Sequence, residues 1–172
     1  MNELPEFVSW PKIPRWENDH VIITEKLDGT NAQILITPFG EVFTGSRNQW
    51  ITPEKDNYGF ARWVQENIDE VRKLGHGRHY GEWYGQGIQR TYNLPTKRFA
   101  LFNTFRPPET LPEGIEIVPI LYQGIFQEEL INEYCSELIN KGSRASPNFM
   151  NPEGICIYWK QSKRIHKCII NK

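Results

Sequence analysis

A lysine, an aspartate and a glycine stand at fixed spacing near the start of the chain, within the run Glu25-Lys26-Leu27-Asp28-Gly29-Thr30-Asn31. A lysine held between two strands can act as a nucleophile once its ammonium, with a reference pKa of about 10.4, has lost a proton. Partial burial and neighbouring positive charge favour the neutral amine. Asp28 can fix the amine's position, and Gly29 lets a substrate approach the backbone. The same residues also fit a polar hairpin turn with Asp-Gly at its centre, so the motif alone leaves both interpretations open.

The run Glu-Lys-Leu-Asp-Gly-Thr-Asn resembles the nucleotide-binding motif of the covalent nucleotidyltransferases, the superfamily of polynucleotide ligases and RNA capping enzymes. In that superfamily the lysine of the Lys-x-Asp-Gly motif becomes bonded to AMP or GMP. Asn31 stands where the DNA ligases usually carry an arginine, which favours the RNA ligases of the phage ligase 2 and kinetoplastid editing type. The resemblance implies that Lys26 is the nucleophile and that Glu25 and Asn31 belong to the nucleotide site.

Two further motifs follow in the order that this family uses. Arg47, in Gly-Ser-Arg-Asn, resembles the family's arginine that contacts phosphate or the nucleic-acid end, and its planar fork suits phosphate. Glu82, in Tyr-Gly-Glu-Trp-Tyr-Gly, matches the Gly-Glu motif whose glutamate accepts hydrogen bonds from the ribose. Gly81 and Gly85 would let a ligand approach the backbone there. The alternatives are a solvated charge at a loop end for Arg47 and an exposed strand residue for Glu82.

An aromatic residue for the base is expected in the run Phe-Ala-Leu-Phe-Asn-Thr-Phe, which ends at Phe105. By strand alternation Phe102 shares a face with Ala100 and Thr104, so a flat base would find room against it. The resemblance implies that Phe102 stacks on the purine. Asn103 replaces the aspartate that commonly follows in the family, and packing in the core is the alternative role for Phe102.

The last motifs supply a metal ligand and a cation. Glu153, in Glu-Gly-Ile-Cys-Ile, matches the family's glutamate that places the catalytic metal, and Mg²⁺ prefers carboxylate, water and phosphate oxygens. Lys167 resembles the first lysine of a closing Lys-x-Lys motif, and it would neutralise the α-phosphate during attack. Ile169 stands in place of the second lysine. The alternatives are a carboxylate at a turn and a lysine on an edge strand.

Taken together, the resemblance implies an ATP-dependent RNA ligase that uses Mg²⁺ or Mn²⁺. Its catalytic residues would be Lys26 and Lys167, its metal ligand Glu153, and its nucleotide-binding residues Glu25, Asn31, Arg47, Glu82, Phe102 and Lys167. AMP would pass from the lysine to a 5′-phosphate of RNA, and a 3′-hydroxyl would displace it. Three alternatives stay open: GTP-dependent capping, action on DNA, and a degenerate domain that binds a nucleotide or a nucleic-acid end without turnover.

Hydrophobic periodicity predicts the elements that must position these residues. Strands are predicted over residues 21–24, 32–37, 41–44, 79–85, 98–105, 115–122, 154–159 and 165–170, and helices over 58–74 and 127–140. This order fits one α+β domain over residues 1–172, with two antiparallel sheets and flanking helices. The resemblance implies a ligase-type, ATP-grasp-like fold with the nucleotide between the sheets. It also implies an adenylation domain alone, with a separate partner for gripping RNA.

Composition limits how the chain could contact nucleic acid and in which compartment it would work. The 172 residues carry a net charge of -1, so any nucleic-acid contact must come from local patches rather than from a global basic field. Three cysteines without CxxC spacing argue against a disulfide framework or a zinc site and favour a reducing compartment, the cytoplasm. No apolar run approaches the roughly 18 residues that a membrane span needs.

Overall fold

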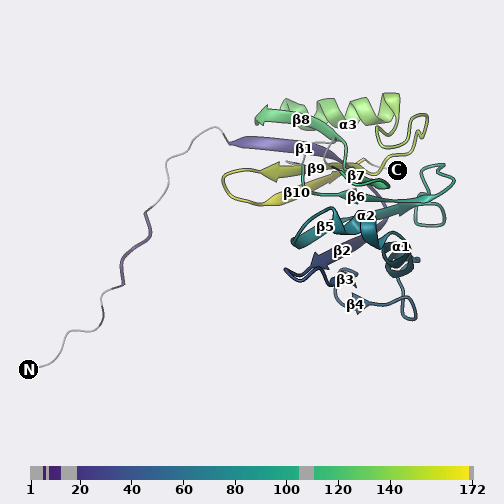
Figure 1. Ribbon diagram of the computed structural model, residues 1–172. Coiled ribbons are helices and arrows are strands. Elements are labelled where there is room, and N and C mark those ends of the chain that lie inside the picture. The colour runs from purple at the N-terminus through teal and green to yellow at the C-terminus, as the bar shows by residue number, and fades with distance from the viewer. Residues whose placement is uncertain (1–5, 7, 13–18, 105–110, 171–172) are drawn as a thin grey trace, which may run out of the picture.

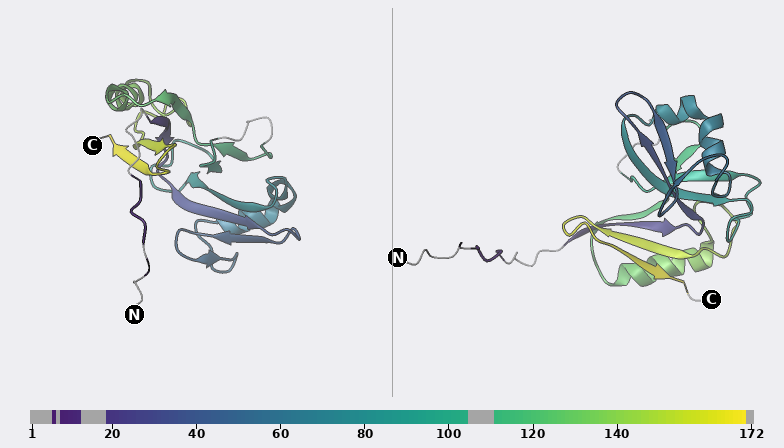
Figure 2. Two further views of the ribbon diagram at one scale, coloured as in Figure 1. Left: turned by 90° about the vertical axis from the view of Figure 1, so that its left-hand side faces the viewer. Right: turned by 90° about the horizontal axis from the view of Figure 1, so that it is seen from below.

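The computed structural model describes residues 6, 8–12, 19–104 and 111–170. Its strands form two sheets that lie one above the other, and the chain crosses between them twice (Figures 1 and 2). The α+β class and the mostly antiparallel sheets predicted from the sequence are confirmed. The prolines and aromatic residues of the segment 1–19 predict an extended conformation rather than a helix, and this segment falls mostly outside the described residues.

The smaller sheet has the strand order β10-β9-β1-β8. Its strands are β1 (His20–Lys26), β8 (Ile120–Ile125), β9 (Gly154–Trp159) and β10 (Ile165–Ile169). One face packs against helix α3 (Glu129–Lys141) through Val21, Ile23, Ile155 and Ile157 from the sheet and Leu130 and Leu138 from the helix. Gly142 ends this helix at a φ of 82°, and its N–H donates to the carbonyl of Leu138. Ile139, near the end of the helix, is exposed.

The larger sheet has the order β4-β3-β2-β5-β6-β7. Its strands are β2 (Thr30–Ile36), β3 (Val42–Gly45), β4 (Trp50–Ile51), β5 (Gly77–Gly85), β6 (Lys97–Leu101) and β7 (Ile115–Ile117). The pairing of β6 with β7 is parallel, which corrects the expectation of purely antiparallel sheets. The predicted strand over 115–122 is divided, because the chain leaves β7 at Val118 and Pro119 and enters β8 in the other sheet.

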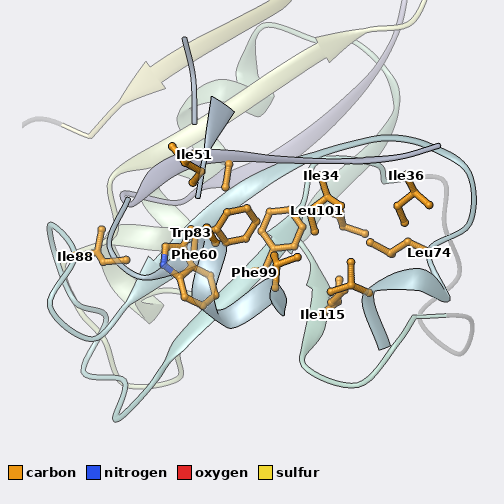
Figure 3. Close-up of a cluster of buried hydrophobic side chains, with 14 residues drawn as sticks. Ile34, Ile36, Ile51, Phe60, Leu74, Trp83, Ile88, Phe99, Leu101 and Ile115 are labelled. Atoms are coloured by element: carbon orange, nitrogen blue, oxygen red, sulfur yellow. The ribbon is translucent and has the colours of Figure 1, made fainter. Parts of the chain in front are cut away.

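The core of the larger sheet lies between the sheet and two short helices, α1 (Phe60–Glu66) and α2 (Ile68–Arg72) (Figure 3). The ring of Phe60 lies 5.3 Å from that of Trp83 and 5.0 Å from that of Phe99, measured between centroids. A single helix was predicted over 58–74. The helix breaks at Asn67, whose side-chain amide donates to the carbonyl of Trp63 over 2.8 Å and competes with a continued helix.

Strands β1 and β2 belong to different sheets, although only three residues separate the end of β1 at Lys26 from the start of β2 at Thr30. The charged run that contains Lys26 therefore connects the two sheets and is not a hairpin turn. Lys26 itself is the last residue of β1, and Asn31 lies at the start of β2. None of the helices within the described residues is long and apolar enough to cross a membrane.

Candidate nucleotide site

A cavity of about 360 Å³ lies where the two sheets meet, a volume within the range typical of small-molecule sites. Residues of both sheets and of the two connections between them line it. Those with predicted roles are Glu25, Lys26, Asn31, Glu82 and Phe102. The fold therefore brings together residues that are up to 143 positions apart in sequence, as the spacing from Ile22 to Ile165 shows.

Strand register places three rows of side chains on the cavity face of the smaller sheet. Residues paired directly across neighbouring strands point to the same face. The first row contains Lys26, Gly154 and Ile169, and the second contains Thr24, Cys156 and Lys167. The third contains Ile22, Tyr158 and Ile165. Lys167 is exposed on the edge strand beside Cys156, so it flanks the cavity without lining it.

Lys26 forms a partly buried ion pair with Glu153. Its Nζ lies 2.5 Å from Oε2 of Glu153, and the two side chains are 22% and 15% exposed. Glu153 immediately precedes β9, whose first residue Gly154 pairs with Lys26. The residue predicted to place a metal thus lies against the predicted nucleophile.

Glu82 is buried under the loop that follows Lys26, with 7% of its surface exposed. Its Oε1 accepts from the N–H of Gly29 over 3.0 Å, and its Oε2 accepts from Nδ2 of Asn31 over 3.1 Å. Burial raises the pKa of this carboxyl to about 7, although the Gly29 N–H and the charge of Lys26 act in the opposite direction. A carboxyl with such a pKa changes its charge near neutral pH.

Gly29 is required by protein packing rather than by a ligand. A Cβ at this position would lie 2.4 Å from the carbonyl oxygen of Trp83, so the loop can approach β5 only with glycine. A Cβ at Gly81 would meet the carbonyl of Ala100 at 2.4 Å, and one at Gly85 would meet that of Thr96 at 2.5 Å. The sequence-based reason for these three glycines, close approach of a ligand, is therefore replaced by close approach of neighbouring backbone.

Glu25 points away from Lys26, as alternation along β1 requires. Only 1% of its surface is exposed, and its Oε2 accepts from the N–H groups of Arg144 and Ala145 over 2.8 and 3.1 Å. Burial raises the pKa of this carboxyl. The side chain fixes the loop after α3 to the strand that carries Lys26, and the residue also lines the cavity.

Phe102 follows directly after β6 and lines the cavity with 45% of its surface exposed. Its N–H donates to the carbonyl of Tyr80 over 2.9 Å, which fixes the backbone at that point. Ala100 faces the opposite way from the buried residues Phe99 and Leu101, as alternation predicted. Asn103 and Thr104 also line the cavity, because the strand ends at Leu101 and alternation no longer applies. Phe105 lies outside the described residues.

Arg47 lies outside the cavity lining, exposed on the turn after β3. The strand before it pairs with β2, and Gly45 lies opposite Gln33, two residues beyond Asn31. Arg47 is therefore on the same side of the molecule as the start of β2, and its contact with phosphate stays a prediction.

Two residues from the loop 86–96, Arg90 and Tyr92, support the site although no sequence motif pointed to either of them. Arg90 Nε lies 2.8 Å from Oδ2 of Asp28, and its Nη1 donates to the carbonyl of Pro152 over 2.8 Å. The hydroxyl of Tyr92 accepts from the N–H of Asp28 over 2.8 Å. Neither residue belongs to a recognisable sequence pattern, so only the tertiary structure reveals them.

The carboxylates present fit a divalent metal that arrives with a nucleotide. No group of three or more His, Cys, Asp or Glu side chains that could hold a metal ion occurs within the described part of the chain. Mg²⁺ and Mn²⁺ sites that handle nucleotides commonly combine one or two carboxylates with phosphate oxygens and water. Glu153 lies beside Lys26 and is partly exposed, so its carboxylate fits this requirement, and its role as a metal ligand stays a prediction.

Comparisons with known proteins agree with this geometry. A family model described as RNA ligase matches residues 19–169. Structures of Naegleria gruberi RNA ligase are similar in fold: a variant with ATP and Mn gives a TM-score of 0.66 at 19% identity, over 88% of this chain and 50% of that chain. A variant with AMP and Mn gives a TM-score of 0.65 at 18% identity, over 88% of this chain and 50% of that chain. The ligase with PPi gives a TM-score of 0.62 at 17% identity, over 89% of this chain and 50% of that chain. No curated protein sequence is significantly similar to the chain. The chain spans about half the length of these structural relatives.

Proposed function

The chain belongs to the RNA ligase family, and on that premise we propose that it is an ATP-dependent RNA ligase that forms a covalent lysyl-AMP intermediate on Lys26. The observation that carries the proposal is the position of Lys26. It ends β1 at the cavity, 2.5 Å from Glu153, and the cavity also contains Glu82 and Phe102. A nucleotide in this cavity would present its α-phosphate to the amine if its base lay against Phe102 and its ribose at Glu82.

In the first step the neutral amine of Lys26 attacks the α-phosphorus of ATP. The N–P bond forms as the bond between the α-phosphorus and the bridging oxygen breaks, and pyrophosphate leaves with that oxygen. The lysine must lose a proton before it attacks, and the carboxylate of Glu153 beside it is the group that would accept this proton. Splitting one difficult displacement into covalent steps is the general logic of nucleophilic catalysis.

Other residues of the chain would hold the nucleotide and orient it. Glu82, as the carboxylate, would accept from the ribose hydroxyls, and Phe102 would stack on the adenine. Lys167 lies one row from Lys26 and would face the phosphates from the edge strand. A divalent metal ion, when bound, supplies positive charge beside the phosphates, and Glu153 would hold it.

In the later steps AMP would pass from Lys26 to the 5′-phosphate of an RNA end, and a neighbouring 3′-hydroxyl would displace AMP and seal the strand. These later steps and the choice of RNA as the substrate are parts of the proposal. The support is membership of the RNA ligase family. All three cysteines are free thiols, which supports a reducing compartment such as the cytoplasm.

The test is the intact mass of the protein after incubation with ATP and Mg²⁺ in the absence of RNA. The wild-type protein should gain one adenylyl group that survives denaturation, and Lys26→Ala should gain none. Lys55→Ala, which removes an exposed lysine outside the cavity, is the matched control and should gain the same group as the wild type. Adenylylation of Lys26→Ala would refute the proposal, and a gain from GTP in place of ATP would indicate capping-type chemistry.

A further inference from the structure

The larger sheet has one face covered by helices, and its other face is buried around Glu82 but exposed farther from the cavity. This other face carries Glu82 at the cavity and continues away from it with exposed side chains from three strands. We call these the aromatic face: Phe43, Trp50, Arg78 and Tyr80. Its three aromatic residues are 47%, 50% and 51% exposed, although aromatic side chains of this size are usually largely buried.

Three of the four residues of the aromatic face, Phe43, Trp50 and Arg78, contact one another. The rings of Phe43 and Trp50 lie 6.0 Å apart, and the guanidinium of Arg78 lies 5.6 Å from the centre of the Trp50 ring. Arg78 Nη1 also donates to Oε1 of Gln33 over 3.3 Å. Stacking of the guanidinium on indole restricts both side chains, so a ligand that binds here loses little further side-chain freedom.

The aromatic face is continuous with the nucleotide cavity. Arg78, Tyr80 and Glu82 alternate along β5, so their side chains point to the same face and follow one another at about 6.7 Å, two strand residues. The carbonyl of Tyr80 accepts from the N–H of Phe102, a cavity residue. A chain that leaves the cavity along β5 therefore passes over Tyr80 and then reaches Arg78, whose guanidinium lies against the ring of Trp50.

We propose that the aromatic face binds the unpaired bases of the RNA strand whose end enters the cavity; this inference rests on the proposed function. Aromatic side chains on an open sheet suit bases that are splayed out of a helix, and base stacking is tolerant of sequence. The one charged member, Arg78, is a cation and complements a phosphate backbone. Because the whole chain carries a net charge of -1, stacking rather than a broad basic surface supplies most of the affinity.

The experiment measures binding of a short 3′-labelled, 5′-phosphorylated RNA by fluorescence anisotropy, with EDTA and without ATP. The full chain is compared on the single strand and on the same RNA annealed to its complement. Trp50→Ala and Tyr80→Ala should each weaken binding of the single strand by roughly 5- to 150-fold, the equivalent of about 1 to 3 kcal/mol per stacked base. Trp50→Phe should keep most of the affinity, because it retains a ring.

Phe39→Ala is the matched control, because Phe39 is a fully solvated aromatic residue, 91% exposed, on the turn between β2 and β3 and outside the aromatic face. It should leave RNA binding unchanged. Arg78→Gln should reduce the slope of log K against log salt by about 0.7, the contribution of one phosphate contact on a single strand. Far-ultraviolet circular dichroism of each variant separates loss of binding from loss of fold.

Three results would overturn the inference. The first is equal affinity of the wild-type protein for the duplex and the single strand, and the second is binding of the single strand by Trp50→Ala as tight as that of the wild type. The third is a wild-type dimer that the Trp50→Ala substitution dissociates without weakening RNA binding. The last would assign the face to a second copy of the chain. Lysyl-AMP formation, measured separately without RNA, tests the proposed function. If the protein forms no lysyl-AMP but its RNA binding depends on Trp50, the proposed RNA-binding surface is supported and the proposed ligase activity is refuted.

Discussion

Arg90 and Asp28 form an ion pair that joins two separate parts of the nucleotide site. The Nε–Oδ2 distance is 2.8 Å, and the two side chains are 11% and 27% exposed. The same guanidinium donates from Nη1 to the carbonyls of Asn151 and Pro152, over 3.0 and 2.8 Å. Asp28 follows Lys26 by two residues, and Pro152 directly precedes Glu153. One side chain therefore fixes the relative position of the predicted nucleophile and the predicted metal ligand.

Arg90→Gln should slow lysyl-AMP formation by about a hundredfold, because a shift of about 1 Å between reacting groups can cost that much. Arg90→Lys should restore little of the rate, since a single ammonium cannot replace a planar fork that contacts both segments. The measurement is the single-turnover rate at saturating ATP. Arg62→Gln, at an exposed arginine of α1, is the control. A wild-type rate in Arg90→Gln, with unchanged thermal unfolding, would contradict the positioning role.

The affinity for ATP should depend on the charge of Glu82. Burial raises the pKa of this carboxyl to about 7, so the acid is largely protonated at pH 6 and largely ionised at pH 8. The carboxylate accepts hydrogen bonds from ribose better than the neutral acid does. The KM for ATP in lysyl-AMP formation should therefore fall as the pH rises through about 7 and then level off.

The control for this pH dependence is a nucleotide without the ribose hydroxyls. With 2′,3′-dideoxyadenosine triphosphate, the KM should be higher than with ATP, and it should not change as the pH passes through 7. The reason is that Glu82 then has no ribose hydroxyl to accept a hydrogen bond from. An identical pH profile for both nucleotides would assign the titration to another group.

Phe102→Ala should raise the KM for ATP by roughly 5- to 150-fold, or about 1 to 3 kcal/mol, the scale of base stacking on an aromatic side chain. Phe102→Tyr should keep most of the affinity, because the ring face remains. The half-exposed ring contributes little to the core, so the thermal unfolding midpoint should change little. A nucleotide-bound structure in which the base lies away from Phe102 would rule out this assignment.

Gly29→Ala should reduce both stability and lysyl-AMP formation. The added Cβ would lie 2.4 Å from the Trp83 carbonyl and 2.7 Å from the Cβ of Tyr84, so the loop must move away from β5. Overpacking of this kind costs about 1 to 3 kcal/mol, measurable by denaturant unfolding. The displaced loop would also break the hydrogen bond from the Gly29 N–H to Glu82. Wild-type stability and rate together would show that the loop accommodates the methyl group.

Ile169→Lys should accelerate the steps after lysyl-AMP formation. Ile169 lies in the same row as Gly154 and Lys26, and it is 40% exposed, so a lysine there would reach toward the phosphates. A single well-placed donor at a developing charge can contribute roughly a hundred- to a thousandfold in rate, which is the upper limit of the expected gain.

The measurement compares sealing of a pre-adenylylated nicked RNA duplex with sealing of the same duplex carrying a plain 5′-phosphate and ATP. The wild-type protein should seal the pre-adenylylated duplex faster, and Ile169→Lys should narrow the difference. His166→Lys, at an exposed residue whose side chain alternates to the opposite face of β10, should not narrow it. Equal wild-type rates on both substrates would show that the isoleucine does not limit the reaction.

The sequence by itself determined most of the strands, the side chains that share a face, and the order of the motifs. It did not predict β4, and it joined β7 and β8 into one strand. Alternation placed Ala100 opposite Phe99 and Leu101 without any knowledge of the fold, because side-chain direction within a strand follows from local backbone geometry. The series of motifs from Lys26 to Lys167 pointed to a ligase. Patterns of this kind involve residues that are close in sequence, so they can be identified without the structure.

Only the tertiary structure decided which sheet each strand joins. The sequence favoured neither partner for β1, and the hairpin interpretation failed because β1 pairs with β8 and β9 rather than with β2. The structure also decided the role of Arg90, which contacts Asp28 across 62 positions of sequence. A contact between distant residues depends on how complete sheets and loops pack together, and no local pattern records it. For the same reason the glycines could be located from the sequence, whereas the backbone that each one accommodates could not.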